Sequence, residues 1–434
     1  MQLYISVFIK EIYMILQIIN YVIIFVLPVL YLSQMLNLII SIFTRYKKYP
    51  TCDNLHTFGY IICAKDEEEV IDKLIKSIYA QNYPAELMHV FVICDNCTDN
   101  TLKISKELGA NIIERNNLDF VGKGYALDYG IKEILKDYNN LEIDAYFIFD
   151  ADNLLTADYT LKMNNLLAAN IKVATSYRNS QNLSKNFFSA NSAFLFLREC
   201  EIIHKARSRL GIGTYVSGTG FYVSKEVLEE LGGWPFYTLI EDIEFSLYCA
   251  NNKIKIGYAY DAIFYDEQTE SYKDSFNQKI RWCKGNIECF KKGYKSLIKN
   301  FFKKRNISCF EMFTHTFPFP AITLLWSFLY VNILFILALI NNYSFMEFYY
   351  SGFNSIVNYY FAITIACYIQ VFYTIIKCHK KVKCKKIMLF IYSLAFPFYV
   401  IWLGLLLAIS LFVKVKWKKI RHINNKTIND MEVS

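Results

Sequence analysis

The chain has 434 residues, of which 54% are hydrophobic and 17% are aromatic, and its formal net charge at pH 7 is +8. This composition is too apolar for an ordinary soluble protein, so it excludes a purely soluble enzyme and predicts a membrane part. Much of the positive charge comes from lysines beside apolar segments, which favours anionic membrane lipid as a partner and not nucleic acid.

Four stretches without any Asp, Glu, Lys or Arg predict membrane segments. They cover residues 12–44, 312–346, 348–376 and 387–413. Each exceeds the roughly 20 residues that a helix needs to cross the hydrocarbon core of a bilayer. We expect an N-terminal anchor at 1–44. At 312–413 we expect two spans followed by a third span or a re-entrant segment, because Pro397 interrupts the last stretch.

The placement of basic residues predicts the orientation of these segments. Arg45, Lys47 and Lys48 follow the first stretch, whereas the loop at 341–351 has no Lys or Arg. Basic loops stay preferentially in the cytoplasm, so the large hydrophilic block at 45–289 is expected there, in a multi-pass protein of the cell membrane. A re-entrant last segment would also return the basic tail at 414–434 to the cytoplasm.

The hydrophilic block alternates short β-rich runs with helical ones. The runs GYIICA at 59–64, MHVFVIC at 88–94 and AYFIF at 145–149 are typical strands, and amphipathic segments lie between them. This alternation indicates βαβ units. We therefore expect an α/β domain with a Rossmann-like, mostly parallel sheet and helices on both faces.

Acidic groups follow three of these strands, in AKDEE at 64–68, CDNCTDN at 94–100 and DAD at 150–152. Ligands bind at the carboxyl ends of such strands, so the three loops are expected to converge on one crevice. An Asp after a strand is also a common helix N-cap, which is the alternative for each site alone. Asp150 and Asp152 flank one small residue and can approach a hard cation, Mg²⁺ or Mn²⁺, that bridges a diphosphate.

Two predicted helix starts add candidates. Lys123 stands between two glycines, where an ammonium and backbone NH groups suit phosphates, although an ordinary loop has the same pattern. Glu241 and Asp242 begin a later helix, where the helix dipole alone favours acidic residues. The functional alternative is that Asp242 takes a proton from an acceptor hydroxyl.

The segment QKIRW at 278–282 is by itself typical of the start of an interfacial helix. The region 290–311 then begins with a basic amphipathic pattern. Its apolar face carries Phe290, Tyr294, Leu297, Ile298, Phe301 and Phe302. We expect this helix to lie on the inner leaflet, with packing on the protein core as the alternative.

Taken in order, AKDEE, CDNCTDN, DAD, SGTG, IED and QKIRW resemble the motif series of family 2 glycosyltransferases. The likeness is greatest to the membrane-embedded cellulose, hyaluronan and poly-N-acetylglucosamine synthases, and it covers about residues 59–285. It implies a GT-A fold, a UDP-sugar donor, a Mg²⁺ or Mn²⁺ cofactor and a direct displacement that inverts the anomeric centre. The sequence departs from the family pattern at Asp66, where Asn is usual, and at Ile240, where Thr often precedes the Glu-Asp pair.

The resemblance also implies roles by position. Nucleotide-sugar contacts would come from Ala64, Asp66, Glu68, Asp95, Lys123, Asp150, Gln278 and Arg281. The metal would be held by Asp152 with Asp150, and Asp242 would be the general base, with Glu241 beside it. Acceptor contacts would come from Gly218, Thr219, Gly220 and Trp282.

Three functions are compatible with this pattern. The first is processive synthesis of a β-linked extracellular polysaccharide that passes through the protein's own membrane segments, with the glycan as acceptor. The second is transfer of one sugar to a membrane lipid, because three or four spans are few for a polymer channel. The third is a non-catalytic membrane scaffold. An accessory subunit or a second copy of the chain would be a compatible partner.

Overall fold

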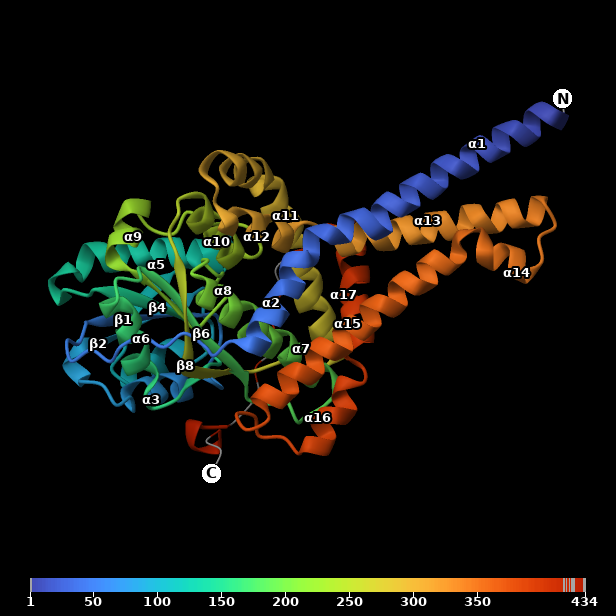
Figure 1. Cartoon of the computed structure of the whole chain (residues 1–434). Helices are drawn as coiled ribbons and strands as arrows, with labels where there is room; N and C mark the ends of the chain where they lie inside the picture. Colours follow the sequence, from blue (N-terminus) through green and yellow to red (C-terminus); the bar gives the residue numbers. More distant parts are fainter. Residues whose placement is uncertain (1, 417, 419, 421, 423–425, 432–434) are drawn as a thin grey trace.

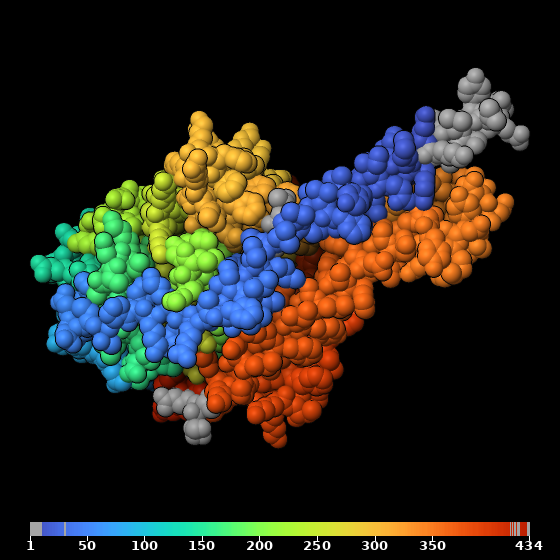
Figure 2. All heavy atoms as spheres, in the orientation of Figure 1, coloured from blue at the N-terminus to red at the C-terminus, as the bar shows by residue number. Residues whose placement is uncertain are grey.

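The computed structural model describes residues 2–416, 418, 420, 422 and 426–431. A part built on a β-sheet lies beside a group of long apolar helices (Figure 1). In the space-filling view, the N-terminal segment and the segment 319–378 run together away from the sheet (Figure 2).

One sheet of eight strands organises the hydrophilic block, in the order β3-β2-β1-β4-β7-β6-β8-β5. Of the seven neighbouring pairs four are parallel, and β7 is antiparallel to both its neighbours. The predicted α/β fold with a mostly parallel sheet is therefore confirmed. The strands are β1 (Phe58–Ala64), β2 (Met88–Asp95), β3 (Asn111–Arg115), β4 (Ala145–Asp150), β5 (Leu154–Leu155), β6 (Val173–Ser180), β7 (Phe221–Ser224) and β8 (Ile256–Asp266).

Helices cover both faces of the sheet because successive strand residues point to opposite sides. Tyr60 and Ile62 of β1 face one core and Ile61 faces the other. The first core is covered by α3 (Ile71–Tyr79), α4 (Thr101–Glu107) and α6 (Tyr159–Ala168). The second is covered by α5 (Lys123–Asp137), α9 (Lys225–Leu231) and α10 (Glu241–Asn251). Short turns lie at η3 (Ala85–Leu87) and η4 (Asn139–Leu141).

The strand register aligns the acidic loops. Cys63 of β1 pairs with Asp150 of β4, and Ala64 pairs with Cys94 of β2. The carboxyl ends of β1, β2 and β4 therefore meet at one edge, as the sequence predicts.

Among the residues that the structure describes, three helical segments are long and apolar enough to cross a membrane, namely Glu11–Phe43, Phe319–Ile340 and Phe345–Cys378. Their surfaces carry exposed apolar side chains such as Phe328 and Phe361, which suit hydrocarbon better than water. The predicted membrane segments are thus present as candidate spans. Their parts are α1 (Gln2–Tyr21), η1 (Val22–Val26), η2 (Leu27–Tyr31), α2 (Leu32–Phe43), α13 (Phe319–Ile340), α14 (Phe345–Phe348), η6 (Tyr349–Phe353) and α15 (Asn354–Cys378).

The last apolar stretch forms a bent pair, α16 (Lys386–Ser393) and α17 (Phe396–Ser410), with an angle of 44° between them. Pro397 lies in the first turn of α17, next to the bend. Before the pair, the backbone carbonyl of Lys381 accepts a hydrogen bond from Asn179 of β6 at 2.7 Å. After it, Lys426 donates to the carbonyl of Gln181 at 2.6 Å. Residues on both sides of the pair in the sequence therefore contact the sheet part.

A single helix, α11 (Tyr272–Lys304), contains both QKIRW and the basic amphipathic segment that was expected to begin separately at 290. Leu297 is buried against α10 and α12 (Ile307–Thr316), whereas Phe302 is 73% exposed. The segment therefore packs on the core along one side and keeps apolar groups exposed along another. A contact with the inner leaflet stays a prediction.

The remaining helices connect the sheet to the apolar part. They are α7 (Phe187–Arg198), η5 (Glu199–His204) and α8 (Lys205–Leu210). Phe194 and Leu197 of α7 share a buried cluster with Val371 of α15 and Phe396 of α17. In the C-terminal tail, η7 (Ile428–Asp430) lies beside β5 and β8. Of the predicted basic tail at 414–434, residues 417, 419, 421, 423–425 and 432–434 lie outside the described residues.

Candidate active site

A cavity of about 580 Å³ lies at the carboxyl edge of β1, β2 and β4 and extends to α11, α13 and α17. Most of the predicted site residues line it, which brings together segments more than 200 residues apart in sequence. These lining residues are Ala64, Asp95, Lys123, Asp150, Asp152, Gly218, Glu241, Asp242, Gln278, Arg281 and Trp282. Asp66, Glu68, Thr219 and Gly220 are not among the residues that line it.

Asp66 and Glu68 join the loop after β1 to the loop after β2. The Asp66 carboxylate accepts a hydrogen bond from the Thr98 backbone NH at 2.6 Å. The Glu68 carboxylate accepts two from Asn100, at 3.0 Å from the backbone NH and at 2.8 Å from the side-chain amide. Both side chains therefore hold the two loops together, and their expected contact with uridine stays a prediction. Glu67, which sequence reasoning did not single out, lines the cavity instead.

Lys123 and Asp150 form a partly buried ion pair that lines the cavity. The Lys123 ammonium contacts Asp150 and also donates to the Gly218 carbonyl at 2.7 Å. Burial works to lower the pKa of Lys123, but Asp150 and Glu241 outweigh it and raise that pKa above its ordinary value. Burial likewise works to raise the pKa of Asp150, and Lys123 holds it below its usual range. Both groups are therefore charged, and the ammonium lies where it can meet a phosphate.

The loop SGTG at 217–220 packs against the backbone of Asp150. The Asp150 backbone NH donates to the Thr219 hydroxyl at 2.9 Å, and that hydroxyl also contacts Asn153. Gly220 has a φ of 68°, and a Cβ there would lie 2.1 Å from a ring carbon of Phe264. Only glycine suits this position, so the loop can hold the Asp150 backbone in place.

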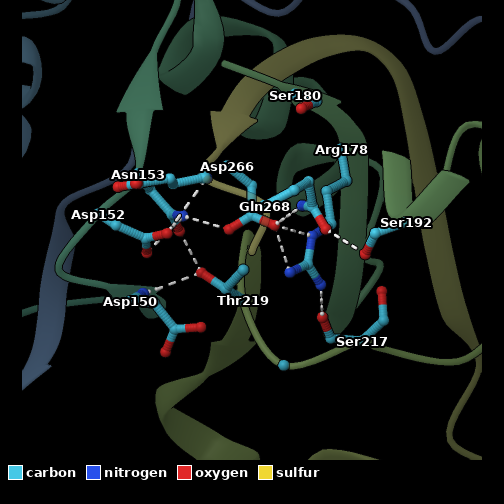
Figure 3. Close-up of polar contacts among 12 residues, drawn as sticks. Asp150, Asp152, Asn153, Arg178, Ser180, Ser192, Ser217, Thr219, Asp266 and Gln268 are labelled. Carbon is cyan, nitrogen blue, oxygen red and sulfur yellow. Dashed lines mark hydrogen bonds and ion pairs between the residues drawn. The ribbon is translucent and has the colours of Figure 1, made fainter. Parts of the chain in front are cut away.

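An arginine network that the sequence did not reveal lies beside these residues (Figure 3). Arg178 of β6 donates through Nε to the Asp266 carboxylate at 2.8 Å and through a terminal nitrogen to the Ser217 carbonyl at 2.6 Å. Gln268 donates to the same carboxylate at 2.6 Å. Both Arg178 and Asp266 line the cavity. The register that places Ser180 of β6 opposite Asp266 of β8 creates this network.

Asp152 lies in a group of acidic and imidazole side chains. Its carboxylate accepts from the Glu267 backbone NH at 3.2 Å, and His422 of the C-terminal tail lies 3.4 Å away through Nδ1. Burial raises the pKa of Asp152 well above its ordinary value, although His422 opposes the shift. Burial works to lower the pKa of His422, but Asp152 and Glu267 raise it to about 10. Ligand atoms of Asp152, Glu267 and His422 all lie within 4.8 Å of one another, so these side chains can hold a metal ion.

Glu241 and Asp242 occupy the first turn of α10, as predicted. Burial, with the neighbouring Asp242 charge, raises the pKa of Glu241 to about 7. Burial also raises the pKa of Asp242, although the Ile243 backbone NH and Lys123 oppose the shift. Deprotonated at neutral pH, Asp242 would be a stronger base than an exposed aspartate.

QKIRW contributes one wall of the cavity from α11. Gln278 accepts a hydrogen bond from Lys279 at 2.7 Å, and Arg281 donates to the Leu239 carbonyl at 2.9 Å. The Lys279 ammonium lies 3.7 Å from the ring centre of Trp282. Beyond Trp282 the lining includes the largely apolar Cys283, Pro320, Val400, Leu403, Gly404 and Leu407, together with Asn286 and His315. The cavity therefore has a charged end at the sheet and an aliphatic end between α13 and α17.

Comparison with known proteins identifies the hydrophilic block. A family model described as "Glycosyltransferase like family 2" matches residues 56–285, which is more than half of the chain. A β-monoglucosyldiacylglycerol synthase of Synechocystis sp. is 24% identical over 234 residues, covering 52% of this chain and 47% of the relative. A UDP-forming cellulose synthase catalytic subunit of Pseudomonas fluorescens is 25% identical over 255 residues, covering 57% of this chain and 32% of the relative.

The chain spans about half the length of the first of these curated relatives. Among solved structures, a mannosyltransferase of Pyrobaculum calidifontis in complex with GDP-Man and Mn²⁺ is 15% identical. The superposition covers 68% of this chain and 85% of the mannosyltransferase chain, with a TM-score of 0.49.

Proposed function

The chain belongs to the glycosyltransferase like family 2, and we propose that it transfers a sugar from a UDP-sugar to an acceptor that reaches the site from the membrane. The observation that carries this proposal is the continuity of the cavity. One space joins the carboxylates of Asp150, Asp152 and Asp242 to aliphatic side chains of α17.

The charged end suits the donor. Lys123 at the start of α5 offers an ammonium and helix NH groups to the diphosphate, and Arg281 and Gln278 can close over it from α11. The oxygen donors of Asp150 and Asp152 fit Mg²⁺ or Mn²⁺. When bound, such an ion neutralises charge that develops on the departing diphosphate.

The boundary between the two ends suits the chemistry. Asp242 would accept the proton of the attacking acceptor hydroxyl, while the diphosphate leaves toward Lys123 and Arg281. A base and a clamp for the leaving group suffice for direct displacement, which inverts the anomeric centre. Trp282 offers a ring face to the acceptor sugar or head group.

The aliphatic end favours a lipid as the acceptor. Val400, Leu403 and Leu407 have no group that can hydrogen-bond a sugar hydroxyl, and burying such hydroxyls unpaired costs free energy. The name of the Synechocystis relative, a glucosyldiacylglycerol synthase, supports the same acceptor class. Extension of a β-linked polysaccharide uses the same reaction, and the name of the cellulose synthase relative keeps it as the second candidate.

We also propose the membrane arrangement that the charge pattern predicts. The transferase domain at 45–289 faces the cytoplasm, and the anchor at 1–44 and the segments at 312–413 hold it at the cell membrane. The contact between the tail and the sheet part supports this arrangement, because it keeps the tail and the domain on one side.

A donor and product screen tests the proposal. The full chain in lipid vesicles would be incubated with individual UDP-sugars and Mg²⁺ or Mn²⁺, with UDP release measured and the product sized. We expect one UDP-sugar to give a lipid that carries a single sugar. A long glycan as the product would favour polysaccharide synthesis over transfer to a lipid acceptor. Absence of UDP release with every donor would contradict the transferase proposal and favour a scaffold.

A further inference from the structure

The cavity is also lined by polar side chains that the proposed mechanism leaves unused. These are Glu199 at the start of η5, Tyr215 before β7, Asn286 of α11 and His315 of α12. They come from four separate segments of the chain, and none lies in the motifs from AKDEE to QKIRW. The motifs therefore do not explain why these polar groups line one cavity.

Contacts connect three of these side chains in a row. The Asn286 amide donates a hydrogen bond to the Thr316 carbonyl at 3.2 Å, and Thr316 follows His315 in α12. The ring centres of His315 and Tyr215 lie 4.3 Å apart. Tyr215 is only 1% exposed, so the packing around it fixes the position of its ring.

Glu199 extends this row toward Asp242. Burial raises the pKa of Glu199, and the charge of Asp242 adds to the shift, whereas the Tyr215 hydroxyl opposes it. Asp242 and Tyr215 therefore both lie close to the Glu199 carboxyl. Glu199 Oε2 and the Tyr215 hydroxyl are buried and make no hydrogen bond with another described residue. Unpaired buried groups cost free energy unless a ligand pairs with them.

The other end of the row adjoins the aliphatic lining of the cavity. Ile287, which follows Asn286 on α11, shares a buried cluster with Leu407 of α17, and Cys283 packs against it. Apolar and hydrogen-bonding groups thus follow one another along one cavity. A lipid with its acyl chain beside α17 would have its head group along the row and a hydroxyl near Asp242.

The charges around Glu199 discriminate between kinds of head group. A carboxylate accepts hydrogen bonds from hydroxyls, but it repels a phosphate. Two guanidinium groups act on the Glu199 carboxyl, and both have other partners. Arg198 donates to the Gln370 side chain at 3.0 Å. Arg178 donates to the Asp266 carboxylate at 2.8 Å. With these cations engaged, the row favours an uncharged head group.

We propose that Glu199, His315 and Asn286, with Tyr215 as a positioning residue, form a head-group subsite that selects an uncharged, hydroxyl-bearing lipid over a phosphate-bearing one. The inference rests on the proposed function and narrows its acceptor class. Glu199 accepts a hydrogen bond from a head-group hydroxyl beside the one that attacks, and so directs the attacking hydroxyl to Asp242.

Photolabelling with two matched lipids tests the subsite without any donor. The full chain in phosphatidylcholine vesicles would be labelled with a 1-acylglycerol that carries a photoreactive acyl chain, and with its 3-phosphate. We expect half-maximal labelling by the acylglycerol at a mole fraction at least about tenfold lower than by the phosphate. Glu199→Ala should weaken labelling by the acylglycerol by about 10- to 100-fold. Glu230→Ala, at an exposed glutamate of α9 outside the cavity, is the matched control and should change neither.

Equal or tighter labelling by the phosphate in the unaltered protein would overturn the inference. So would unchanged labelling of Glu199→Ala by the acylglycerol. Selective labelling without UDP release from any UDP-sugar would leave the subsite in place and contradict the transferase proposal. Transfer to lipid that is indifferent to Glu199 would leave the transferase in place and remove the subsite.

Tyr215→Phe provides a variant that should fold normally, because the hydroxyl it removes makes no hydrogen bond with a described residue. Its thermal unfolding midpoint should match that of the unaltered protein. In transfer assays, KM for the acylglycerol should rise several-fold, whereas KM for the UDP-sugar should stay unchanged. Glu199→Gln should show the same division between the two KM values. Unchanged KM for the acylglycerol in both variants would contradict the subsite.

Discussion

The two ends of the cavity are built from opposite kinds of side chain. At the sheet end, charged groups such as Lys123, Arg178 and Asp266 are paired, partly or fully buried, and held by backbone contacts. At the membrane end, Leu403 and Leu407 offer only apolar surface. Buried charges are tolerated only when paired, so the sheet end has a fixed geometry. The aliphatic side chains of α17 have no directional groups, so they can select an acceptor only by its size and apolar character.

This difference separates the tasks of recognising a donor and admitting an acceptor. A phosphate-bearing donor needs directional partners, which the sheet supplies at strand ends. A hydrocarbon chain needs only an apolar cavity from which water is excluded. The reaction is then expected at the boundary, where Asp242 and Trp282 lie, and changes on either side of it should have different effects.

The largest effect is expected for Asp242→Asn. Loss of the general base should lower the rate of transfer by about 10²- to 10⁴-fold and leave UDP binding unchanged. UDP release and calorimetric UDP binding measure the two quantities. Asp72→Asn, at a surface ion pair on α3, is the control and should retain full activity. Wild-type transfer by Asp242→Asn would remove this residue from the mechanism.

The second largest effect is expected for Trp282→Ala, which should reduce transfer by about 100-fold and leave membrane insertion intact. Its ring borders the cavity beside Lys279 and Phe196, where it can contact the acceptor. Transfer assays and membrane fractionation distinguish the two effects. Trp282→Phe should recover part of the activity. A protein that fails to insert would show that the tryptophan is a membrane-interface residue.

A bulky residue in the aliphatic end should act on the acceptor alone. Leu403→Trp should lower transfer to lipid by about 10- to 100-fold by overfilling the space, with donor binding unchanged. Leu405→Trp, two residues away on a side chain that is 49% exposed, is the matched control and should have little effect. Equal losses in both variants would mean that the helix is disturbed and not the cavity.

The smallest expected effect is a gradual loss of activity in acid. Burial raises the pKa of Glu241 to about 7 and raises the pKa of Asp242 above its ordinary value, so both carboxyls become protonated at a higher pH than exposed carboxyls as the solution is acidified. A protonated carboxyl cannot accept the acceptor proton, so the rate should fall by up to tenfold per pH unit on the acid side. Initial rates of transfer at saturating donor, measured across the acid range, give this side of the pH–rate profile. A constant rate down to pH 4.5, in protein that stays folded, would contradict it.

Local patterns made the sheet, the strand-end carboxylates and the apolar segments predictable. Alternating hydrophobicity identified the strands, and their parallel order placed Asp95, Asp150 and Asp152 at one edge. The expected bend at Pro397 also follows from a local property, because proline does not continue a helix.

Other features depend on non-local packing and could not be read from sequence. Arg178 and Asp266 meet only through the register of β6 and β8. Asp66 has a φ of 54°, which no local pattern indicates, and its carboxylate accepts a hydrogen bond from Thr98. His422 lies in a tail that the sequence marks only as basic. The continuity of α11 across residue 290 likewise depends on its packing against α10 and α12.

The central claim is that the acceptor reaches the strand-end carboxylates along the aliphatic lining that α17 contributes to the cavity. Cross-linking with a diacyl lipid that carries a photoreactive acyl chain, followed by mass spectrometry of the 396–410 segment, tests it most directly. We predict adducts at Leu403 and Leu407, which line the cavity, and their loss when Leu403→Trp fills it. Adducts confined to Phe398 and Leu405, which face outward, would contradict the claim.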